Sequence, residues 1–530
     1  MPPRKMRRMP AAAADARDLD RPEGTTRLLG RGGNQARGLA EYAIDFFRGQ
    51  ADPSPATLER LEQFHIDSIG CGVSAIAAAA RAPTVLRREA LASRPAAGSA
   101  GGICFGSTRP LDVAAAVVAN ASAVREWDAN GTNFGYDPLR GRVAGEFGHN
   151  DFYPVALAAA RLAGLDGAAT LRVMLLVDEI RGRLAEVFAL RRYGIDHVHH
   201  GAIASAAAFT AALGGSAAVI ESAIGLVAAH HVPFRAIRAG EQLSDSKGAS
   251  AAFAAEAAVR AGIRALDGFV GPADVFRNPL AIYRLHEPCS DGTSPFDLEL
   301  GLGGDAFAIH GMHFKLGLYE HQSAAAIQSI VDCLADNPSL AAAVEGIERI
   351  RVRIYQPAFG IIADPAKRRP TTRQSADHSL PYIVARTLLK AEAAAAAGVP
   401  PDWAGLMLLP ADYCDAAIGD PRTIGLIDRI EIEHGGEEYD AAYPDGIPTS
   451  VTIEHASLGR LGGTLVRHPL GHAAADREAT GRLVALKFRR LVEAAVDDPD
   501  RLRDRLALAG RSPAEVATHY AFPIRGIDPD

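Results

Sequence analysis

Two short segments near the first quarter of the chain combine the side chains that acid–base chemistry needs. Residues 125–132 read Arg-Glu-Trp-Asp-Ala-Asn-Gly-Thr, and residues 148–151, after a glycine-rich loop, read Gly-His-Asn-Asp. Both lie between alanine-rich stretches that we expect to be helical, and such connections often display catalytic groups. The carboxylate of Asp128, the hydroxyl of Thr132 and the imidazole of His149 therefore favour proton transfer.

More histidines and lysines follow, separated by long apolar stretches. His197, Lys247 and Lys315 lie far apart in the sequence, each close to other polar residues. They meet only if the intervening helices fold around one pocket. Because lysines attract anions, that pocket is expected to bind a negatively charged substrate.

Length, composition and charge limit the classes of function. With 530 residues the chain exceeds one ordinary core, which predicts two domains or three. A net charge of -7 argues against nucleic acid as a partner, because a phosphate backbone needs a basic surface. No Gly-x-Gly-x-x-Gly follows a strand and no Walker motif occurs, so the sequence indicates neither a dinucleotide nor ATP as a cofactor.

The cysteines and the N-terminal segment bear on the cellular compartment. The five cysteines are odd in number and widely spaced, which predicts a reducing cytoplasm and no disulfide framework. Residues 1–35 are rich in Arg, Pro, Ala and Gly, and we expect a disordered extension. A transit peptide is the alternative, although acidic residues interrupt its positive charge. No charge-free apolar stretch reaches the ~18 residues of a membrane span.

Helical periodicity dominates as far as about residue 265. Gly70 and Gly72 follow an apolar stripe, and we expect another helix to approach closely there. Alanine is a strong helix former with little bulk, so tight helix packing follows. The sequence predicts a large all-helical domain over residues 36–300. Its expected helices cover roughly residues 112–124, 154–163, 169–190, 202–213, 218–230 and 249–265.

The pattern changes over residues 301–470, where we predict a smaller α+β domain. Residues 347–354 and 427–433 largely alternate apolar and charged side chains, which is typical of a strand with one solvent-exposed face. Two shorter strands are expected over residues 450–454 and 463–467, and helices over residues 324–335 and 379–394. The expected sheet is antiparallel. Residues 471–530 return to a helical pattern, and this tail is expected to pack on the first domain. The fold class is thus mainly α with an α+β second domain.

The order of these signals resembles the MmgE/PrpD family, which includes 2-methylcitrate dehydratase and cis-aconitate decarboxylase. The likeness runs from about residue 40 to residue 475. No single motif is as specific as a P-loop, but the motifs occur in the family's order. They are residues 66–72, 128–132, 148–149, 178–180, 194–197, 314–315, 376–382 and 468–472, together with Lys247 and Arg373.

The resemblance implies a helical domain covered by an α+β lid, usually in a homodimer, and an active site between them. It places Asp128, His149, His197, Lys247 and Lys315 at the catalytic centre and Thr132, Arg125 and Arg373 around the substrate. Cofactor and metal are expected to be absent.

Three stretches depart from the family pattern. Gly131 holds the position of an acidic residue, and Asn150-Asp151 replaces the usual Pro-Ser after His149. The stretch between Lys315 and His321 is shortened. Because these changes fall in the expected pocket, they affect the choice of substrate.

The implied chemistry is removal of water from a small di- or tricarboxylate. Such a reaction needs a base, an acid and cations that hold the substrate carboxylates. Histidine suits the first two roles because its unperturbed pKa, about 6.5, lies near neutral pH. We expect His149 and His197 to be acid and base in an unassigned order, with Asp128 orienting a histidine or taking the proton itself. Lys247 and Lys315 clamp the substrate.

Other interpretations stay open at this point. The same scaffold could decarboxylate or epimerise its substrate, or bind a carboxylate without turnover. Asp128 and Thr132 could cap a following helix, and Asp377 or Ser379 could do so before residue 380. His197, His199 and His200 could form a metal cluster, although no Cys or Glu-x-x-His completes the set. Asp377-His378-Ser379 resembles a hydrolase triad in composition only, because triad members come from distant segments.

Overall fold

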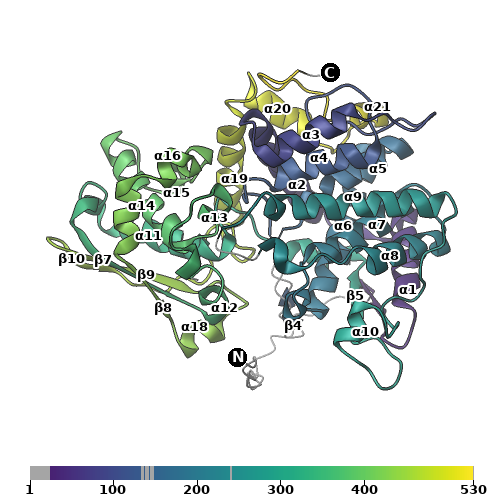
Figure 1. Ribbon diagram of the computed structural model, residues 1–530, viewed down its shortest axis with the longest axis horizontal. Coiled ribbons are helices and arrows are strands. Elements are labelled where there is room, and N and C mark those ends of the chain that lie inside the picture. Colours follow the sequence, from purple (N-terminus) through teal and green to yellow (C-terminus); the bar gives the residue numbers. More distant parts are fainter. Residues whose placement is uncertain are drawn as a thin grey trace.

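The chain folds into a large helical domain and a smaller domain with a sheet, which lie side by side (Figure 1). The computed structural model describes residues 24–132, 136–137, 142–143, 148–238, 242–363 and 365–528. Helices make up 56% of the structure and strands 9%. These proportions confirm the prediction of a mainly α protein with a minor α+β part.

The expected helices of the first domain are all present. Side chains of Ser54, Asp112, Asp166 and Ser216 accept hydrogen bonds from the first turns of α2, α4, α6 and α8, each worth about 1 kcal/mol. The helices are α1 (Gln35–Asp45), α2 (Pro55–Ala77), α3 (Arg81–Ala92), α4 (Val113–Arg125), α5 (Tyr153–Ala163), α6 (Gly167–Val187), α7 (Val198–Ala212), α8 (Ala217–His230), α9 (Ser246–Leu266) and α10 (Ile282–His286).

The centre of this domain is a close-packed group of alanine-rich helices. Every residue of α4 is buried, and α4 and α7 both pack on α9. Small side chains let these backbones approach closely, so the ends of α4, α7 and α9 are fixed relative to one another. In the described part of the chain no single helix has the length and apolar composition of a membrane span; α2 and α3, bent by 90°, reach them only as a pair.

The C-terminal tail returns to the helical domain, as the sequence predicts. It forms α19 (Arg477–Val492), α20 (Pro499–Leu506) and α21 (Pro513–Ala517). α19 packs on α2, where a Cβ on Gly70 would lie 2.6 Å from Cδ2 of Phe488. The close approach expected at Gly70 is therefore made by the tail (Figure 1, yellow against purple and blue).

The second domain contains a four-stranded sheet in the order β10-β9-β7-β8. Its strands are β7 (Ile347–Ile354), β8 (Ile430–His434), β9 (Thr449–His455) and β10 (Gly459–Gly462). The expectation of an antiparallel sheet is wrong for one pair, because β7 and β8 run parallel while β9 is antiparallel to β7 and β10. A parallel pair needs a crossover, and the helices between β7 and β8 supply it.

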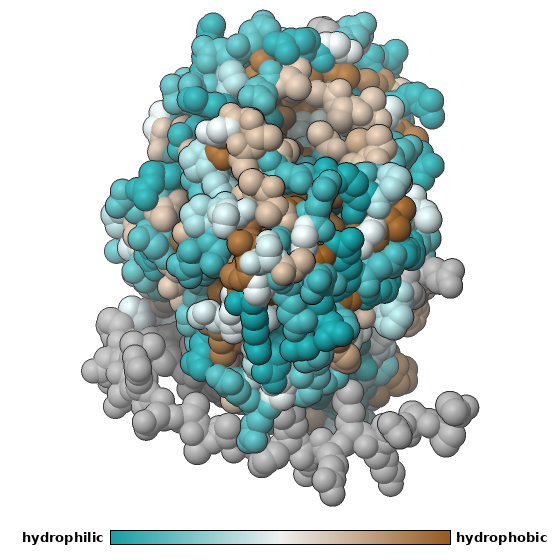
Figure 2. Space-filling model, turned by 90° about the vertical axis from the view of Figure 1, so that its left-hand side faces the viewer, coloured by the Kyte–Doolittle hydropathy of each residue, from teal (hydrophilic) through white to brown (hydrophobic). Residues whose placement is uncertain are grey.

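The two faces of the sheet differ as the alternating pattern predicts. Ile350 and Val352 are buried beneath α11 (Ala324–Asp336) and α14 (Leu380–Ala396), whereas Arg349 forms an ion pair with Glu431 across the outer face. From the side of this domain the surface is mainly hydrophilic, with apolar residues scattered between polar ones (Figure 2).

Two strand boundaries differ from expectation. The segment 427–433 begins in a helix, α17 (Pro421–Asp428), because Asp420 caps it and Pro421 occupies its first turn; β8 starts only at residue 430. The last strand is β10, and residues 463–467 contribute only a bridge between Thr449 and Val466. The expected helix over residues 379–394 is present as α14, capped by the Ser379 side chain.

The N-terminal segment is partly structured, against the expectation of disorder over residues 1–35. Strand β1 (Thr26–Leu29) pairs antiparallel with β5 (Leu298–Gly301). Residues 1–23 lie outside the described residues. The remaining short elements are β2 (Asp52–Pro53), β3 (Tyr136–Asp137), β4 (Arg142–Val143), β6 (Gly303–Gly304), α12 (Gln356–Phe359), α13 (Arg373–Ala376), α15 (Trp403–Leu406), α16 (Asp415–Ile418) and α18 (Glu437–Ala442).

Candidate active site

A cavity lined mainly by cationic side chains lies between the two domains. The helical domain contributes the end of α4, the start of α9 and the loop before α7, and the second domain contributes residues 315–320 and the loop before α14. The cavity encloses about 580 Å³, including the part open to solvent. Its lining residues are Arg125, Asp128, Arg191, His197, Arg235, Arg238, Leu243, Lys247, Lys315, Glu320, Ile361, Lys367 and His378.

Asp128 forms the floor of this cavity. It follows the end of α4 in the left-handed backbone region, with a φ of 46° that few non-glycine residues adopt. Its carboxylate accepts hydrogen bonds from Arg125, at 2.5 Å, and from Lys315, while Lys247 Nζ lies 3.3 Å from Oδ2. All four side chains are almost completely buried. Three segments distant in sequence thus converge on one carboxylate.

The surrounding cations decide the ionisation of Asp128. Burial by itself raises the pKa of a carboxyl group, but the charges of Arg125, Lys315 and Lys247 outweigh burial and hold the pKa of Asp128 well below its usual range. Burial lowers the pKa of Lys315, against the opposing effect of Asp128. Asp128 is therefore a permanent negative charge at neutral pH.

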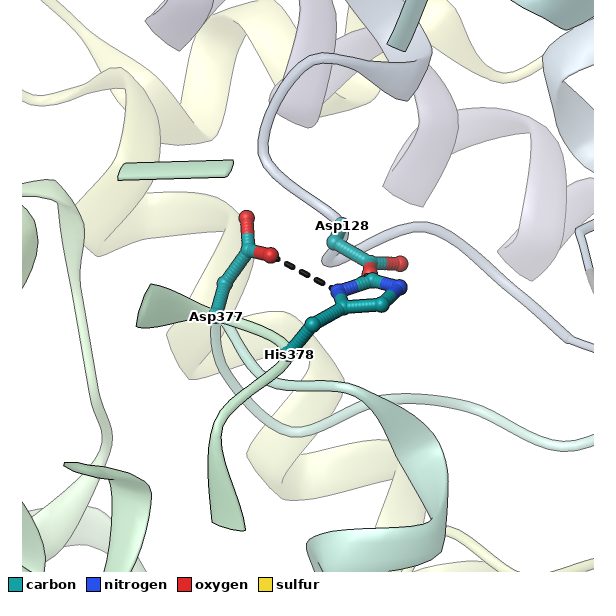
Figure 3. Close-up of side chains that lie close together, drawn as sticks. All are labelled: Asp128, Asp377 and His378. Atoms are coloured by element: carbon teal, nitrogen blue, oxygen red, sulfur yellow. Dashed lines mark hydrogen bonds and ion pairs between the residues drawn. The ribbon is translucent and has the colours of Figure 1, made fainter. Parts of the chain in front are cut away.

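His378 lies between the carboxylates of Asp128 and Asp377 (Figure 3). Its Nδ1 is 3.0 Å from Asp128 Oδ2 and 2.8 Å from Asp377 Oδ1. Burial lowers the pKa of His378 to about 3, with Lys247 adding to the effect. The neutral ring can donate its Nδ1 proton to Asp377.

These three residues also have the spacing of metal ligands, since one ligand atom from each lies within 4.8 Å of the others. However, Lys247 Nζ lies 3.3 Å from Asp128 Oδ2 and 2.5 Å from Asp377 Oδ1. A metal ion between the carboxylates would have to displace this buried ammonium group. The donor set is that of an ion network held by lysine, and it does not fit a resident metal.

Arg373 supports this network from outside the cavity. It donates to Asp377 at 2.9 Å and to Glu126 at 2.6 Å, and its guanidinium lies 5.1 Å from the ring centre of Trp127. Arg373 therefore links the second domain to the segment that carries Asp128. Within the described residues the structure places it behind the site and not on the cavity wall.

His197 is the histidine of the helical domain that reaches the cavity. It immediately precedes α7, and its Nδ1 lies 3.1 Å from Asp196 Oδ1. Asp196 is fixed in turn by Arg238, whose Nε donates to it at 2.6 Å. Burial lowers the pKa of His197 to about 3, although Asp196 opposes the shift, so the imidazole is neutral. Within the described part of the chain neither Nδ1 nor Nε2 has a partner with hydrogen-bond geometry, and Asp196 approaches Nδ1 only at ion-pair distance.

His149 and Thr132 are not among the described lining residues of the cavity. The ring of His149 is fully buried, with Nδ1 3.1 Å from Asp178 Oδ1 and its plane edge-on to Phe64. A Cβ on Gly131 would overlap His149 Nε2, so the glycine at this position is what allows the imidazole to pack there. Thr132 pairs through its backbone with His313. The catalytic role of His149 stays a prediction.

The alternative interpretations of the site residues, as helix caps or as a metal cluster, have different outcomes. Among the described residues no helix begins directly after Asp128, whose carboxylate is paired with cations instead, whereas Ser379 does cap α14. The metal alternative at residues 197–200 finds no support: His199 Nδ1 lies 2.7 Å from the His231 carbonyl, and the ring of His200 stacks on Tyr283. Among the described residues no group with metal-ligand spacing includes them.

Sequence reasoning missed about half of the cavity wall. Arg191, Arg235 and Arg238 lie in short 3₁₀ turns, and Lys367 in another, where no periodic pattern marks them. His378 was considered only as a member of the motif 376–382 and of the sequence Asp377-His378-Ser379, and was given no role in the site. The one available signal was the presence of two arginines at each end of the apolar stretch 193–234, namely Arg191 and Arg192 before it and Arg235 and Arg238 after it.

Lys487, a buried lysine of α19 in the tail, contacts the backbone next to two residues of the site. Its Nζ lies 2.6 Å from Asp67 Oδ1 in α2 and donates to the carbonyls of Ala129 and Lys315, both at 2.7 Å. These carbonyls belong to the residue after Asp128 and to the clamping lysine itself. Lys487 is therefore a positioning residue that ties both domains to the tail.

Replacing Lys487 by methionine is expected to lower the free energy of unfolding by about 3–5 kcal/mol, because the buried Asp67 carboxylate loses its partner. Chemical denaturation measures this change. The double variant Asp67→Asn/Lys487→Met is the control and should recover part of the loss, since no buried charge then remains. A single variant within about 0.5 kcal/mol of the natural protein would contradict the assignment.

Comparison with known proteins agrees with this arrangement. The MmgE/PrpD N-terminal domain model matches residues 37–290 and the MmgE/PrpD C-terminal domain model residues 321–509. The 2-methylcitrate dehydratase of Salmonella typhimurium is 25% identical over 66% of this chain and 68% of its own length. The mitochondrial 2-methylcitrate dehydratase of Yarrowia lipolytica is 24% identical over 85% of this chain and 82% of its own. With both domains matched in order over most of its length, the chain belongs to the MmgE/PrpD family.

Proposed function

We propose that the protein is a cofactor-independent lyase that removes water from a small di- or tricarboxylate, as the name 2-methylcitrate dehydratase describes for its relatives. The observation that carries the proposal is the cavity itself, in which a buried ionised carboxylate and a neutral imidazole lie among seven Arg and Lys side chains. Such a set both attracts polyanions and transfers protons.

The cations divide into two groups with different partners. Arg125, Lys247 and Lys315 are tied to Asp128 at the floor. Arg235 and Arg238 lie beside Asp196, and Arg191 and Lys367 line the same cavity. A substrate with carboxylates at both ends would satisfy both groups, and their field strengthens as water leaves the closed cavity.

His197 is the candidate base. Asp196 beside Nδ1 favours the tautomer protonated there, which leaves the Nε2 lone pair free to take the proton next to a substrate carboxylate. Lys247 and Lys315 would stabilise the negative charge that builds on that carboxylate. Asp128 holds both lysines in place through ion pairs.

Ultraviolet absorbance of the new conjugated double bond tests the proposal, with 2-methylcitrate, citrate and related hydroxy acids as substrates. We expect absorbance to rise with enzyme concentration for at least one acid. Carbon dioxide release from an unsaturated tricarboxylate would instead show decarboxylation on the same scaffold. Binding measured by calorimetry without any turnover would show a silent carboxylate-binding homologue and would overturn the proposal.

We further propose a homodimer in the cytoplasm, with no nucleic acid or membrane as partner. Exposed apolar side chains support the dimer: Val270 is 82% and Leu280 85% exposed, on the segment between α9 and α10. Large apolar side chains that are this exposed are often covered in an interface. The cysteines are unpaired, as in a reducing compartment. Light scattering during size exclusion tests the dimer, which a monomer mass would contradict.

A further inference from the structure

We infer that Glu320, resting on the lyase function proposed above, is the residue that donates a proton to the departing hydroxyl of the substrate. Glu320 lines the same cavity as Asp128, His197 and Lys315, and its side chain is buried, with 5% exposed. It lies in the short stretch after Lys315 that departs from the family pattern. Sequence reasoning did not single it out.

The position of Glu320 is fixed by the backbone on both sides. Its N–H donates to the carbonyl of Asp377 at 2.7 Å, and its Oε2 accepts from the N–H of Gln322 at 2.9 Å. One side-chain oxygen is thus held while the carboxyl group still borders the cavity. A proton donor needs this combination of fixed geometry and access to substrate.

Glu320 differs from Asp128 in lacking a cationic partner. In the described part of the chain, no Lys or Arg nitrogen lies within ion-pair distance of its carboxyl oxygens, whereas Asp128 has three. Burial, and then the charge of Asp128, raise the pKa of Glu320 to about 7, and Lys315 opposes the shift. The charged and titratable groups that face it are Asp128, Arg191, Lys315, Tyr355, Lys367 and Tyr443.

Two carboxyl groups in one cavity are therefore driven to different protonation states. Asp128 stays ionised, while Glu320 carries a proton over much of the range below neutral pH. Environments that separate the pKa values of two nearby carboxyls in this way assign them different roles in acid–base catalysis. An ionised Asp128 cannot donate a proton, and Glu320 can.

The proposed step balances as follows. His197 takes the proton from the carbon next to a substrate carboxylate, and the electron pair of that bond forms the double bond. The bond from the adjacent carbon to its hydroxyl oxygen breaks, and this oxygen takes the Glu320 proton and leaves as water. Glu320 ends ionised and His197 protonated. Transfer of one proton from His197 through solvent to Glu320 restores the starting state.

The test measures turnover across pH for Glu320→Gln and Glu320→Asp. The matched control is Glu221→Gln, at a buried glutamate that is not among the lining residues of the cavity. Glu221 is 3% exposed and contacts Arg37 and Asn34. We expect kcat of the Gln variant to fall by about 10²–10⁴, because an amide cannot donate an acidic proton. The natural protein should lose activity as pH rises through the Glu320 pKa. The Gln variant should lack this alkaline limb, and Asp should restore part of the activity together with the limb.

An infrared difference spectrum provides a readout that does not require turnover. The natural protein should show a protonated carboxyl band that titrates near neutral pH and is absent from Glu320→Gln. If the Gln variant keeps both its kcat and the alkaline limb, the inference is wrong while the lyase function stands. Absence of the band also overturns the inference. If the natural protein turns over none of the acids although the band is present, the proposed function fails and the donor role fails with it.

Discussion

Substitution of Asp128 by asparagine is expected to cost the protein both activity and stability. Asparagine tolerates the left-handed backbone of this position, so the main change is the loss of the negative charge. Arg125, Lys247 and Lys315 would then repel one another in a buried site. We expect the free energy of unfolding to fall by about 3 kcal/mol or more and kcat/KM by about 10²-fold or more.

Asp412→Asn is the matched control, because Asp412 is also a buried carboxylate with a lysine partner, Lys390, at 2.5 Å, and it does not line the cavity. Chemical denaturation and steady-state kinetics are measured on both variants. The control should lose stability and keep its kcat. Unchanged stability in Asp128→Asn would show that the carboxylate does not hold the three cations together.

Replacement of His197 by alanine should lower kcat by about 10²–10⁴ and leave KM within a few-fold, because the imidazole transfers a proton and the cations bind the substrate. Steady-state kinetics on the acid found by absorbance measure both constants. If His197 is the base, its loss slows the chemical step and lowers kcat. If its role is structural, its loss lowers the stability of the protein instead.

The control variant His199→Asn distinguishes a catalytic role of His197 from a structural one. His199 is equally buried, but it bonds to the carbonyl of His231 and is not among the lining residues of the cavity. The control should keep kcat near that of the natural protein. Equal losses in the two variants would indicate damage to α7, and an unchanged kcat in His197→Ala would remove His197 from the mechanism.

Local signals were sufficient for most of the helical domain. The helices between residues 113 and 266 were predicted because their apolar periodicity persists over many turns, and the tail because its pattern continues beyond residue 477. The sheet was predicted less well. The start of β8 was misplaced because Asp420 and Pro421 favour a helix just before it, and strand direction depends on a crossover that periodicity does not reveal.

The sequence predicted those residues of the site that lie in short motifs with other polar residues. Asp128, His197, Lys247 and Lys315 do line one cavity. His149 does not, because Gly131 leaves room for the ring to pack against Phe64, a tertiary effect that sequence order does not contain. His378 and Glu320 were given no role because nothing in their local sequence shows that they border the same cavity, which only the packing of the two domains establishes.

The central claim is tested most directly by a crystal structure of the protein with a bound tricarboxylate. The Asp412→Asn variant is solved as a second sample. The account predicts that the ligand lies between the two domains, with carboxylates on Lys247, Lys315 and Arg191 and with a carbon beside His197 Nε2. A ligand bound elsewhere, or one in this cavity that contacts none of these lysines, would contradict it.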